Sequence, residues 1–276
     1  MTTQSIGTTD AKDLNRSARP FAIVTGASTG IGLELAKQCA ANGFDLLVAA
    51  DEPAIEEAGR MLQGYAGMVD WVVADLSTPE GVDKLLERAR NRPIDALLAN
   101  AGRGLGRGFL DQDFADIERV VDTNITGTLY LVHKVGREMR NRGRGRILIT
   151  GSIAGFMPGT YQAVYNGTKA FLDMFSYALR AEVSACDVTV TCLMPGATET
   201  EFFERADMMD TKVGAEKKAD PAEVAELGFK AMMEGEGGVI AGWQNKLQVA
   251  ISKLMPESVV ARIHEKQAAP GTAKNA

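Results

Sequence analysis

Short apolar runs alternate with longer helical stretches along most of the chain, and this alternation limits the available folds more than any other feature. The runs have the length and aliphatic character of buried strands, and the stretches between them have the pattern of helices. Such alternation predicts βαβ units, and therefore an α/β fold: a single doubly wound Rossmann-type domain with a parallel sheet of about seven strands flanked by helices. The expected strands are 21–25, 45–50, 71–74, 94–99, 146–151, 188–194 and 238–241, and the expected helices are 31–42, 53–63, 79–90, 113–142, 162–185 and 221–234.

A glycine-rich turn follows the first expected strand. Residues 21–24 form the apolar run, Gly26, Gly30 and Gly32 follow it, and residues 33–41 have the pattern of a helix. Glycine lets the backbone approach a pyrophosphate closely, and a helix N-terminus offers free N–H groups and partial positive charge. The spacing Gly-x-x-x-Gly-x-Gly differs from the Gly-x-Gly-x-x-Gly of many dinucleotide sites. We interpret it as a phosphate-binding turn; an ordinary glycine-rich βα connection is the alternative.

A tyrosine and a lysine four residues apart mark the second half of the chain. Tyr165 and Lys169 would share one face of a helix, and Tyr165 follows Ser152 by 13 residues. A phenol ordinarily has a pKa of about 10, and roughly 4 kcal/mol of selective phenolate stabilisation would bring that pKa near 7. One cation about 4 Å away, at an effective dielectric constant near 20, supplies roughly that much. Lys169 could be this cation; the alternative is a Tyr and a Lys on a half-exposed helix.

Together the two motifs resemble the short-chain dehydrogenase/reductase family over about residues 21–242. Further matches stand at the ends of expected strands: Asp75-Leu76, Asn100-Ala101-Gly102 and Pro195-Gly196. Ala99 departs from the family's Asn-Asn-Ala-Gly turn, where the first position is Asn. Asn124 matches the family's fourth catalytic residue, and Thr198 or Thr200 stands where the family's nicotinamide-contacting Thr is expected.

The resemblance implies a role for each of four residues. Tyr165 would be the general acid/base, Lys169 would lower the pKa of the phenol and hold the nicotinamide ribose, and Ser152 would hydrogen-bond the reacting oxygen. Asn124 would hold a water near Lys169. The structural alternatives are a strand-end serine for Ser152 and a helix N-cap for Asn124. The residues expected to bind the cofactor are Thr25, Gly26, Ser28, Thr29, Gly30, Ile31, Gly32, Asp51, Asp75, Leu76, Asn100, Ala101, Gly102, Tyr165, Lys169, Pro195, Gly196, Thr198 and Thr200.

The choice between NAD and NADP depends on charge. The extra phosphate of NADP needs Arg or Lys, but Thr29 precedes Gly30 where many NADP-using relatives have a base, and no base stands beside Asp51 and Glu52 in the sequence. Counting from the preceding turn, Ala50 holds the family's usual acidic position and Asp51 the next. A carboxylate there would accept hydrogen bonds from the ribose and repel a 2′-phosphate. NAD is therefore preferred to NADP; a plain helix cap at Asp51 is the alternative.

Apolar side chains that follow two of the motifs suggest a substrate pocket. The candidates are Phe156, Met157, Phe202 and Phe203. An apolar pocket and a mobile lid over the nicotinamide would suit a medium-sized secondary alcohol or ketone. Core packing or a subunit contact is the alternative. Arg103 or Arg107, in the glycine-rich stretch 102–108, could meet an acid group of the substrate.

Composition argues against several other functions. A formal net charge of −6 argues against nucleic-acid binding, and no apolar run approaches the roughly 20 residues that cross a bilayer. His133 and His264 are too far apart in the sequence for a metal site, and no metal is expected. Three cysteines without metal-like spacing suggest free thiols in a reducing cytoplasm. We expect residues 1–19 and 268–276 to be flexible tails around one dinucleotide-binding and catalytic domain, 20–267.

Three functional hypotheses follow. The first is a cytoplasmic NAD-dependent alcohol dehydrogenase or ketone reductase acting on a small molecule. The second is an NADPH-dependent 3-oxoacyl or other carbonyl reductase. The third is a non-catalytic dinucleotide-binding regulator, against which the presence of all four catalytic residues argues. Because the expected helices 113–142 and 162–185 match those through which family members pair, the resemblance also implies a homodimer or homotetramer.

Overall fold

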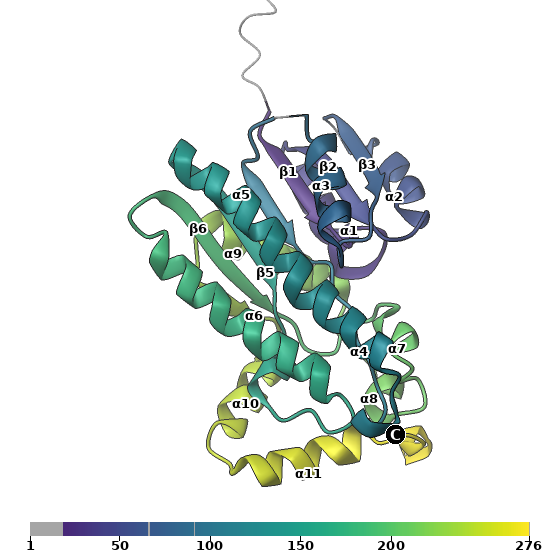
Figure 1. Cartoon of the computed structure of the whole chain (residues 1–276). Coiled ribbons are helices and arrows are strands. Elements are labelled where there is room, and N and C mark those ends of the chain that lie inside the picture. Colours follow the sequence, from purple (N-terminus) through teal and green to yellow (C-terminus); the bar gives the residue numbers. More distant parts are fainter. Residues whose placement is uncertain (1–18, 66, 91, 276) are drawn as a thin grey trace, which may run out of the picture.

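Seven parallel strands form one sheet at the centre of the computed structural model, which describes residues 19–65, 67–90 and 92–275 (Figure 1). The strands are β1 (Phe21–Thr25), β2 (Asp45–Ala50), β3 (Val69–Val73), β4 (Ala96–Ala99), β5 (Arg144–Thr150), β6 (Asp187–Met194) and β7 (Gly238–Ile240). Their order in the sheet is β3-β2-β1-β4-β5-β6-β7, so the winding direction changes between β1 and β4. Open α/β sheets bind ligands at such a switch point, beyond the carboxyl ends of the strands. The predicted fold class is confirmed.

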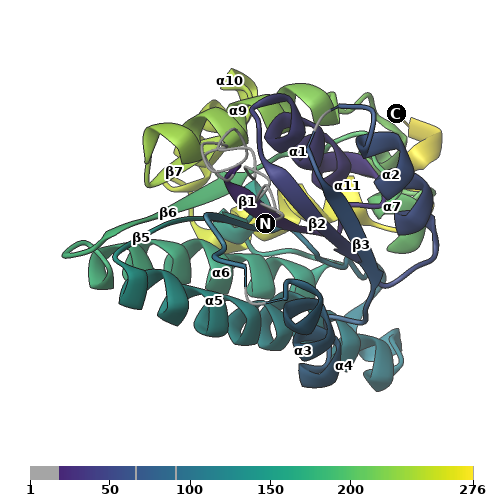
Figure 2. The same ribbon diagram turned by 90° about the horizontal axis from the view of Figure 1, so that it is seen from above.

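Helices cover both faces of the sheet (Figure 2). One layer contains α1 (Gly30–Ala41), α2 (Ala54–Leu62) and α9 (Pro221–Glu234), and the other contains α3 (Pro79–Arg88), α5 (Thr128–Arg142) and α6 (Ala163–Glu182). Side chains of a strand point alternately to the two layers. In β1, Ala22 and Val24 pack in the first apolar core, whereas Phe21 and Ile23 pack in the second. Strands buried on both faces explain the nearly continuous apolar runs in the sequence.

The expected helix 113–142 consists of three pieces. The α-helical parts are α4 (Phe114–Val121) and α5, and a π-helical turn, η3 (Asp122–Gly127), joins them. Gly127 lies so close to the end of β3 that an added Cβ would stand 1.7 Å from the Leu76 carbonyl oxygen. π-Turns of this kind often occur at functional sites.

Among the described residues, no helix combines the length and the apolar composition that a membrane crossing requires.

The sequence patterns did not predict the helices beyond β6 other than α9. These are α7 (Phe202–Arg205), α8 (Lys212–Ala215), α10 (Trp243–Ser252) and α11 (Glu257–Ala268), with two short 3₁₀ turns earlier in the chain, η2 (Phe109–Asp111) and η4 (Ile153–Phe156), and one at the end, η5 (Thr272–Asn275). Gly242, with a φ of 84°, and Pro256 precede α10 and α11, and both residue types commonly precede helices.

The expectation of a loose C-terminal tail from Ala268 is wrong for residues 268–273. Ala268 is 2% exposed and packs in a small apolar cluster. The Thr272 hydroxyl accepts a hydrogen bond from the backbone N–H of Lys212 (3.0 Å), and the Asp210 carbonyl accepts one from the N–H of Ala273 (2.9 Å). These bonds tie residues 272 and 273 to the start of α8 and to the segment just before it. Of the expected N-terminal tail, residues 1–18 lie outside the described part of the chain.

Candidate active site

The glycine turn after β1 brings backbone into close contact at the sheet edge. Gly26 and Gly30 have φ values of 63° and 56°, which favour glycine. A Cβ on Gly32 would stand 1.9 Å from the Gly26 carbonyl oxygen. Thr29 is the N-cap of α1, but its side chain makes no capping hydrogen bond and the first turn contains no acidic residue. The helix therefore presents its N–H groups and positive dipole end to the cleft above the turn, as a pyrophosphate would require.

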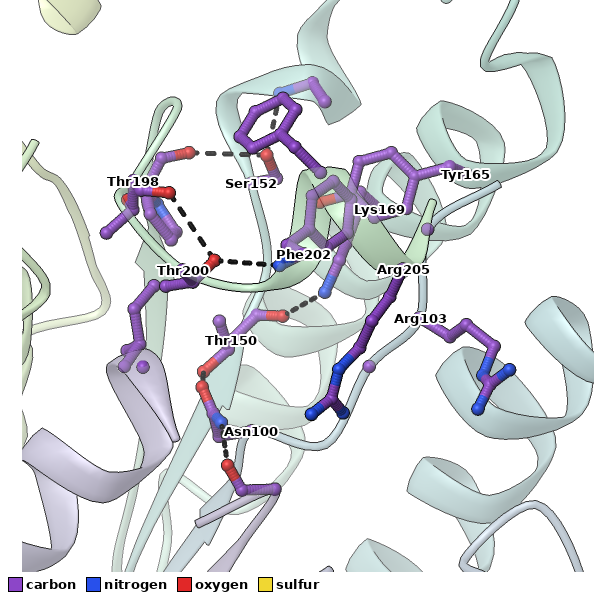
Figure 3. A pocket seen from close by; sticks show the side chains of 18 of the residues that line it. Asn100, Arg103, Thr150, Ser152, Tyr165, Lys169, Thr198, Thr200, Phe202 and Arg205 are labelled. Carbon is purple, nitrogen blue, oxygen red and sulfur yellow. Dashed lines mark hydrogen bonds between the residues drawn. The ribbon is translucent and has the colours of Figure 1, made fainter. Parts of the chain in front are cut away.

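Asn100 ties the ends of three neighbouring strands together (Figure 3). Its amide nitrogen donates hydrogen bonds to the carbonyl oxygens of Thr25 (3.2 Å) and Gly26 (3.3 Å), and its amide oxygen accepts one from the Thr150 hydroxyl (3.0 Å). The Thr25 hydroxyl in turn accepts hydrogen bonds from the N–H groups of Asn100 and Ala101, both at 3.0 Å. These contacts fix the β1, β4 and β5 ends relative to one another.

A cleft of about 400 Å³ runs across these strand ends. Its lining contains most of the residues that the sequence predicted for the site: Gly26, Ser28, Thr29, Gly30, Ile31, Gly32, Asp51, Asp75, Leu76, Asn100, Ala101, Gly102, Ser152, Met157, Tyr165, Lys169, Pro195, Gly196, Thr198, Thr200, Phe202 and Phe203. Thr25, Asn124 and Phe156 do not line it. Thr25 and Asn124 lie behind the surface, where they support the residues that do. Phe156 faces another way, with the Lys253 ammonium 4.7 Å from its ring centroid.

Tyr165 and Lys169 lie one turn apart on α6, beside Ser152 at the end of β5 (Figure 3). The Ser152 hydroxyl donates to the Pro195 carbonyl (3.3 Å) and accepts from the Ala154 N–H (3.1 Å). Lys169 is buried, and its ammonium donates to the Thr150 carbonyl at 2.8 Å. The ammonium lies 5.8 Å from the centroid of the Tyr165 ring.

Burial is the largest influence on the protonation of this pair. Burial raises the pKa of the Tyr165 phenol to about 12, while the Ser152 hydroxyl acts in the opposite direction. Burial also lowers the pKa of Lys169 to about 8, opposed by the nearby Asp173 carboxylate. Desolvation dominates the phenol pKa, and Lys169, whose ammonium donates to the Thr150 carbonyl, does not contribute to this shift; the lowering of the phenol pKa by Lys169 beside a bound nicotinamide stays a prediction.

Asn124 lies inside the π-turn η3, so the helix N-cap alternative is wrong. Its amide oxygen accepts from the backbone N–H of Arg103 (2.7 Å), and its amide nitrogen donates to the Arg103 carbonyl (2.9 Å) and the Thr168 hydroxyl (2.9 Å). The side chain thereby joins the loop after β4 to the helix that contains Tyr165 and Lys169.

Sequence reasoning missed Asp173, one turn beyond Lys169 on α6. Its side chain is fully buried, and one carboxylate oxygen accepts hydrogen bonds from the Ser152 N–H (3.2 Å) and the Cys192 thiol (3.5 Å). The other oxygen has no hydrogen-bond partner within the described protein. Burial raises the pKa of this carboxyl to about 6, while Ser152, Cys192 and Lys169 act to lower it. The Tyr165, Lys169 and Asp173 spacing of four residues was the available signal.

The far end of the cleft combines aromatic rings with a few uncharged polar side chains. The rings of Tyr165 and Phe202 have centroids 5.0 Å apart, and Phe203 packs on Phe202 at 5.3 Å. His264 and Gln267 from α11 also line this end, as does Gln248 from α10. The sequence patterns did not assign these three residues to the site, because they belong to helices that the patterns had not predicted.

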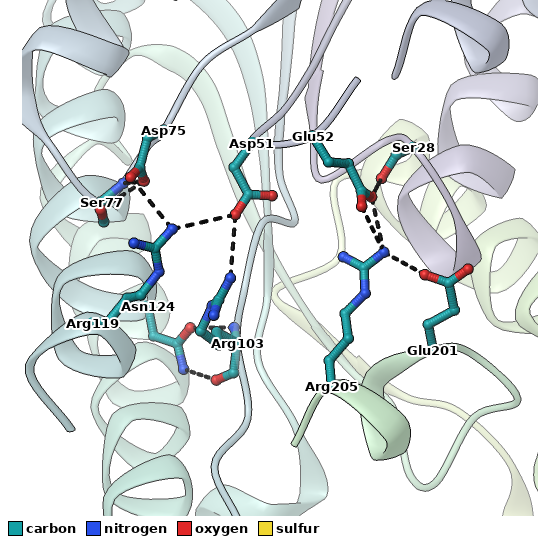
Figure 4. Close-up of polar contacts among 10 residues, drawn as sticks. All are labelled: Ser28, Asp51, Glu52, Asp75, Ser77, Arg103, Arg119, Asn124, Glu201 and Arg205. Atoms are coloured by element: carbon teal, nitrogen blue, oxygen red, sulfur yellow. Dashed lines mark hydrogen bonds and ion pairs between the residues drawn. The ribbon is translucent and has the colours of Figure 1, made fainter. Parts of the chain in front are cut away.

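Arginines distant in the sequence lie beside the carboxylates near β2 (Figure 4). Asp51 pairs with Arg103 (3.3 Å) and Arg119 (3.7 Å), and Arg205 pairs with Glu52 (2.9 Å). No base stands beside these carboxylates in the sequence, but the fold brings three to them, from the loop after β4, from α4 and from α7.

Neighbouring polar groups lower the pKa values of two carboxyls at this end of the cleft, Glu52 and Asp75. Partial burial acts to raise the pKa of Glu52, but hydrogen bonds from Ser28 and Arg205 outweigh it and hold the pKa below its usual value. The Ser77 hydroxyl, and less strongly Arg119, hold the pKa of Asp75 below its usual value. Glu52 and Asp75 are thus held in their ionised, hydrogen-bonded forms.

Arg107 is not available to a substrate acid group. It does not line the cleft but pairs with Asp207 (2.7 Å) and Asp210 (2.9 Å). It therefore fastens the segment between α7 and α8 to the loop after β4.

Comparison with known proteins identifies the family. The model of a family described as short chain dehydrogenase matches residues 20–210. An uncharacterized oxidoreductase of Staphylococcus saprophyticus is 32% identical over 77% of this chain and 91% of its own length. The ketoacyl reductase HetN of Nostoc is 28% identical over 84% of this chain and 82% of its own. The structure of a short-chain dehydrogenase from Sphingobium yanoikuyae in complex with NADPH is 29% identical, with a TM-score of 0.75 over 86% of this chain and 95% of that one. The chain therefore belongs to the short-chain dehydrogenase/reductase family.

Proposed function

We propose that the chain transfers a hydride between a nicotinamide dinucleotide and a secondary alcohol or ketone. One observation carries this proposal: Ser152, Tyr165 and Lys169 meet at one part of a cleft that also contains the glycine turn and the α1 N-terminus. The free helix N–H groups and the close backbone approach at Gly32 suit a pyrophosphate. When bound, the nicotinamide would supply or accept the hydride.

The residues of this chain would handle the proton. In oxidation, Tyr165 takes the proton of the alcohol hydroxyl; in reduction, it gives that proton to the carbonyl oxygen. Ser152 hydrogen-bonds the same oxygen and orients it, and Lys169 stabilises the phenolate and holds the nicotinamide ribose. Asn124 holds the loop after β4 against helix α6 through its hydrogen bonds with Arg103 and Thr168, and it would also hold a water of the proton path.

The preferred cofactor in this proposal is NAD. Asp51 lies at the end of β2, in the cleft lining, where a carboxylate accepts from ribose hydroxyls and repels a 2′-phosphate. The test is titration of the protein with NADH and, separately, NADPH, followed by nicotinamide fluorescence and then by turnover of secondary ketones. Tighter NADH binding with ketone reduction supports the proposal; binding of neither nucleotide overturns it.

A second candidate is an NADPH-dependent 3-oxoacyl or other carbonyl reductase. The observation that favours it is the pair Arg103 and Arg119 beside Asp51, since two guanidinium groups could hold a 2′-phosphate. The NADPH complex of the Sphingobium protein and the ketoacyl reductase HetN are consistent with it. Tighter NADPH binding in the same titration would place this candidate first.

The proposal includes a homodimer or homotetramer in the cytoplasm. Phe171, Met174 and Tyr177 form an exposed apolar stripe on α6, one of the helices through which the family pairs. The described cysteines are all free thiols, as expected in a reducing compartment. Light scattering of the purified protein tests the assembly: a monomeric mass would contradict it.

A further inference from the structure

The two helices α10 and α11 lie at the end of the molecule farthest from the β1 strand start (Figure 1). Between them is an apolar groove of about 330 Å³. The large apolar side chains that line it are Trp243, Leu247, Ile251, Met255, Val260 and Ile263. We name this cavity the tail groove.

The apolar lining of the tail groove is exposed to an unusual degree. Trp243, Leu247 and Ile251 stand at intervals of four residues, and so on one face of α10, yet they are 72%, 52% and 48% exposed. Ile263 on the opposite wall is 45% exposed. None of the lining residues is Asp, Glu, Lys or Arg. Clustered exposed apolar side chains of this kind mark a binding surface, and the lack of charge specifies an uncharged, apolar occupant.

The tail groove is continuous with the cleft. Met157, Gln248, His264 and Gln267 line both cavities, so the groove opens at the far end of the cleft beside Phe202 and Tyr165. The Met157 and Gln248 side chains face each other where the two cavities meet, with 3.9 Å between the Gln248 amide nitrogen and the Met157 sulfur. His264 is held in place by a 2.9 Å hydrogen bond with the Thr160 carbonyl.

We propose that the tail groove binds the aliphatic tail of a substrate whose carbonyl or hydroxyl carbon reacts at Tyr165. The proposal rests on the proposed function and narrows its substrate class to ketones and secondary alcohols with an extended alkyl chain. Continuity with the cleft is what favours a substrate tail: a second protein copy or a lipid surface would need exposed apolar side chains but not an opening into the catalytic centre. Leu254 is 87% exposed and lies outside the groove lining. A substitution there should disturb contact with a second copy or a lipid surface but not binding of a tail in the groove.

The experiment compares reduction of a series of unbranched methyl ketones, from 2-butanone to 2-dodecanone, with the nucleotide that binds more tightly. Burial of each additional methylene should raise kcat/KM by about fourfold until the groove is full. Ile251→Glu should lower the 2-dodecanone to 2-butanone ratio of kcat/KM by about tenfold or more, because it places a carboxylate in the groove. The matched control Leu254→Glu should keep the wild-type ratio. Ile263→Gln, on the other wall, replaces Ile251→Glu if that variant does not fold.

A kcat/KM that does not change with tail length, or a ratio that Ile251→Glu leaves unchanged, would overturn the proposal. Binding of 1,6-diphenylhexatriene, an uncharged fluorescent hydrocarbon, provides a measurement that needs no turnover. Weaker binding in Ile251→Glu but not in Leu254→Glu supports the tail groove even if no ketone is reduced, an outcome that would sink only the proposed activity. Sedimentation with phosphatidylcholine vesicles that both variants abolish would indicate a lipid surface instead. Loss of a dimer in both would indicate a second copy.

Discussion

The two ends of the cleft are built in different ways. At the end proposed to bind the cofactor, backbone groups of β1, β4 and α1 form the surface, and Asn100 and Thr25 make hydrogen bonds of 3.0–3.3 Å that hold the β1 and β4 ends together. At the end proposed to bind the substrate, side chains from α7, α10, α11 and the loop after β5 form the surface, among them those of Phe202, Phe203 and Met157. The cofactor end depends on where the backbone runs; the substrate end depends on which side chains stand there.

Because of this difference, the two ends should tolerate different amino-acid substitutions. A backbone site accepts few residue types, because an added Cβ at Gly32 meets a carbonyl oxygen. A side-chain site accepts many, since apolar residues of similar volume can replace one another at small cost. Substitutions at the first end should therefore act on nucleotide affinity, and those at the second on substrate affinity. Of the proposed catalytic residues between them, Ser152 and Tyr165 should act mainly on turnover, whereas Lys169, which would hold the nicotinamide ribose, should also act on nucleotide affinity.

Tyr165→Phe should have the largest effect, and that effect should be on kcat and not on the affinity of either end for its ligand. Removing the hydroxyl removes the proton donor and acceptor, so kcat should fall by about 10²–10⁴. Nucleotide affinity and thermal stability should stay near wild type, because the ring and its contact with Phe202 remain. Steady-state kinetics with fluorescence titration measures both. Tyr177→Phe on the same helix is the control, and a Tyr165→Phe enzyme within tenfold of wild type would contradict the assignment.

Gly32→Ala should affect the cofactor end. The added methyl group would stand 1.9 Å from the Gly26 carbonyl, so the turn must shift, at a cost of about 1–3 kcal/mol. Nucleotide affinity should fall about 10–100-fold. Gly136→Ala on α5 is the control: the nearest atom to its added Cβ is 3.6 Å away, and alanine should stabilise that helix by roughly 0.5–1 kcal/mol. Equal nucleotide affinity in Gly32→Ala and wild type would show that the turn is not a phosphate site.

The same difference decides how much the sequence could predict. The glycine turn, Asn100 and the Tyr165 to Lys169 spacing follow from backbone geometry or from a helical repeat, so the sequence pattern contains them. The seven strands were expected within about two residues of their bounds, because strands buried on both faces are continuous apolar runs. The positions of α10 and α11 depend on packing against Met157 and its neighbours, which no local pattern records.

Charge at the cofactor end was predicted less well than its backbone. Arg119 is 68 residues beyond Asp51, yet it lies 3.7 Å from it, because the loop after β4 and helix α4 fold back over β2. A search of the sequence near Asp51 could not find it. Asp173 was missed for a related reason: its importance comes from the Ser152 N–H and Cys192 thiol that meet it in the folded chain.

Asp173 lies between the two ends of the cleft, and Asp173→Asn should change how the free energy of unfolding depends on pH. The pKa of Asp173 is raised by burial from 3.8 in the unfolded chain to about 6, so the native state binds this proton more tightly than the unfolded state does. The free energy of unfolding should therefore fall as pH rises from about 4 to 6 and stay lower above that range. Asn carries no charge, so the variant should lack this decrease and gain on the order of 1–2 kcal/mol at pH 7.

Urea denaturation of wild type and Asp173→Asn at several pH values provides the measurement. Glu226→Gln, an exposed residue on α9, is the matched control and should leave the pH dependence unchanged. Parallel pH curves for Asp173→Asn and wild type would mean that the buried carboxyl titrates alike in both states.

Asp51→Ser should shift nucleotide preference by about tenfold toward NADPH. The substitution removes a negative charge and leaves Arg103 and Arg119 free to meet a 2′-phosphate, which is worth about 1.4 kcal/mol at tenfold. The ratio of Kd values for NADH and NADPH measures it. Asp70→Ser on β3, which breaks the exposed pair of Asp70 with Arg88 of α3, is the control. An unchanged ratio would show that Asp51 does not meet the adenosine ribose.

Phe202→Ala should have the smallest effect and should act at the substrate end alone. Its ring packs on Tyr165 and so closely on Gly104 that a Cβ there would stand 2.4 Å from the ring. Loss of an aromatic contact worth about 0.5–1.5 kcal/mol should raise KM for a ketone about 2–13-fold. The kcat and the nucleotide Kd should change little, because no backbone at the cofactor end moves. Phe114→Ala, 64% exposed on α4, should alter none of these values. If Phe202→Ala weakened nucleotide binding as strongly as ketone binding, the two ends would act as one surface and the distinction drawn between them would fail.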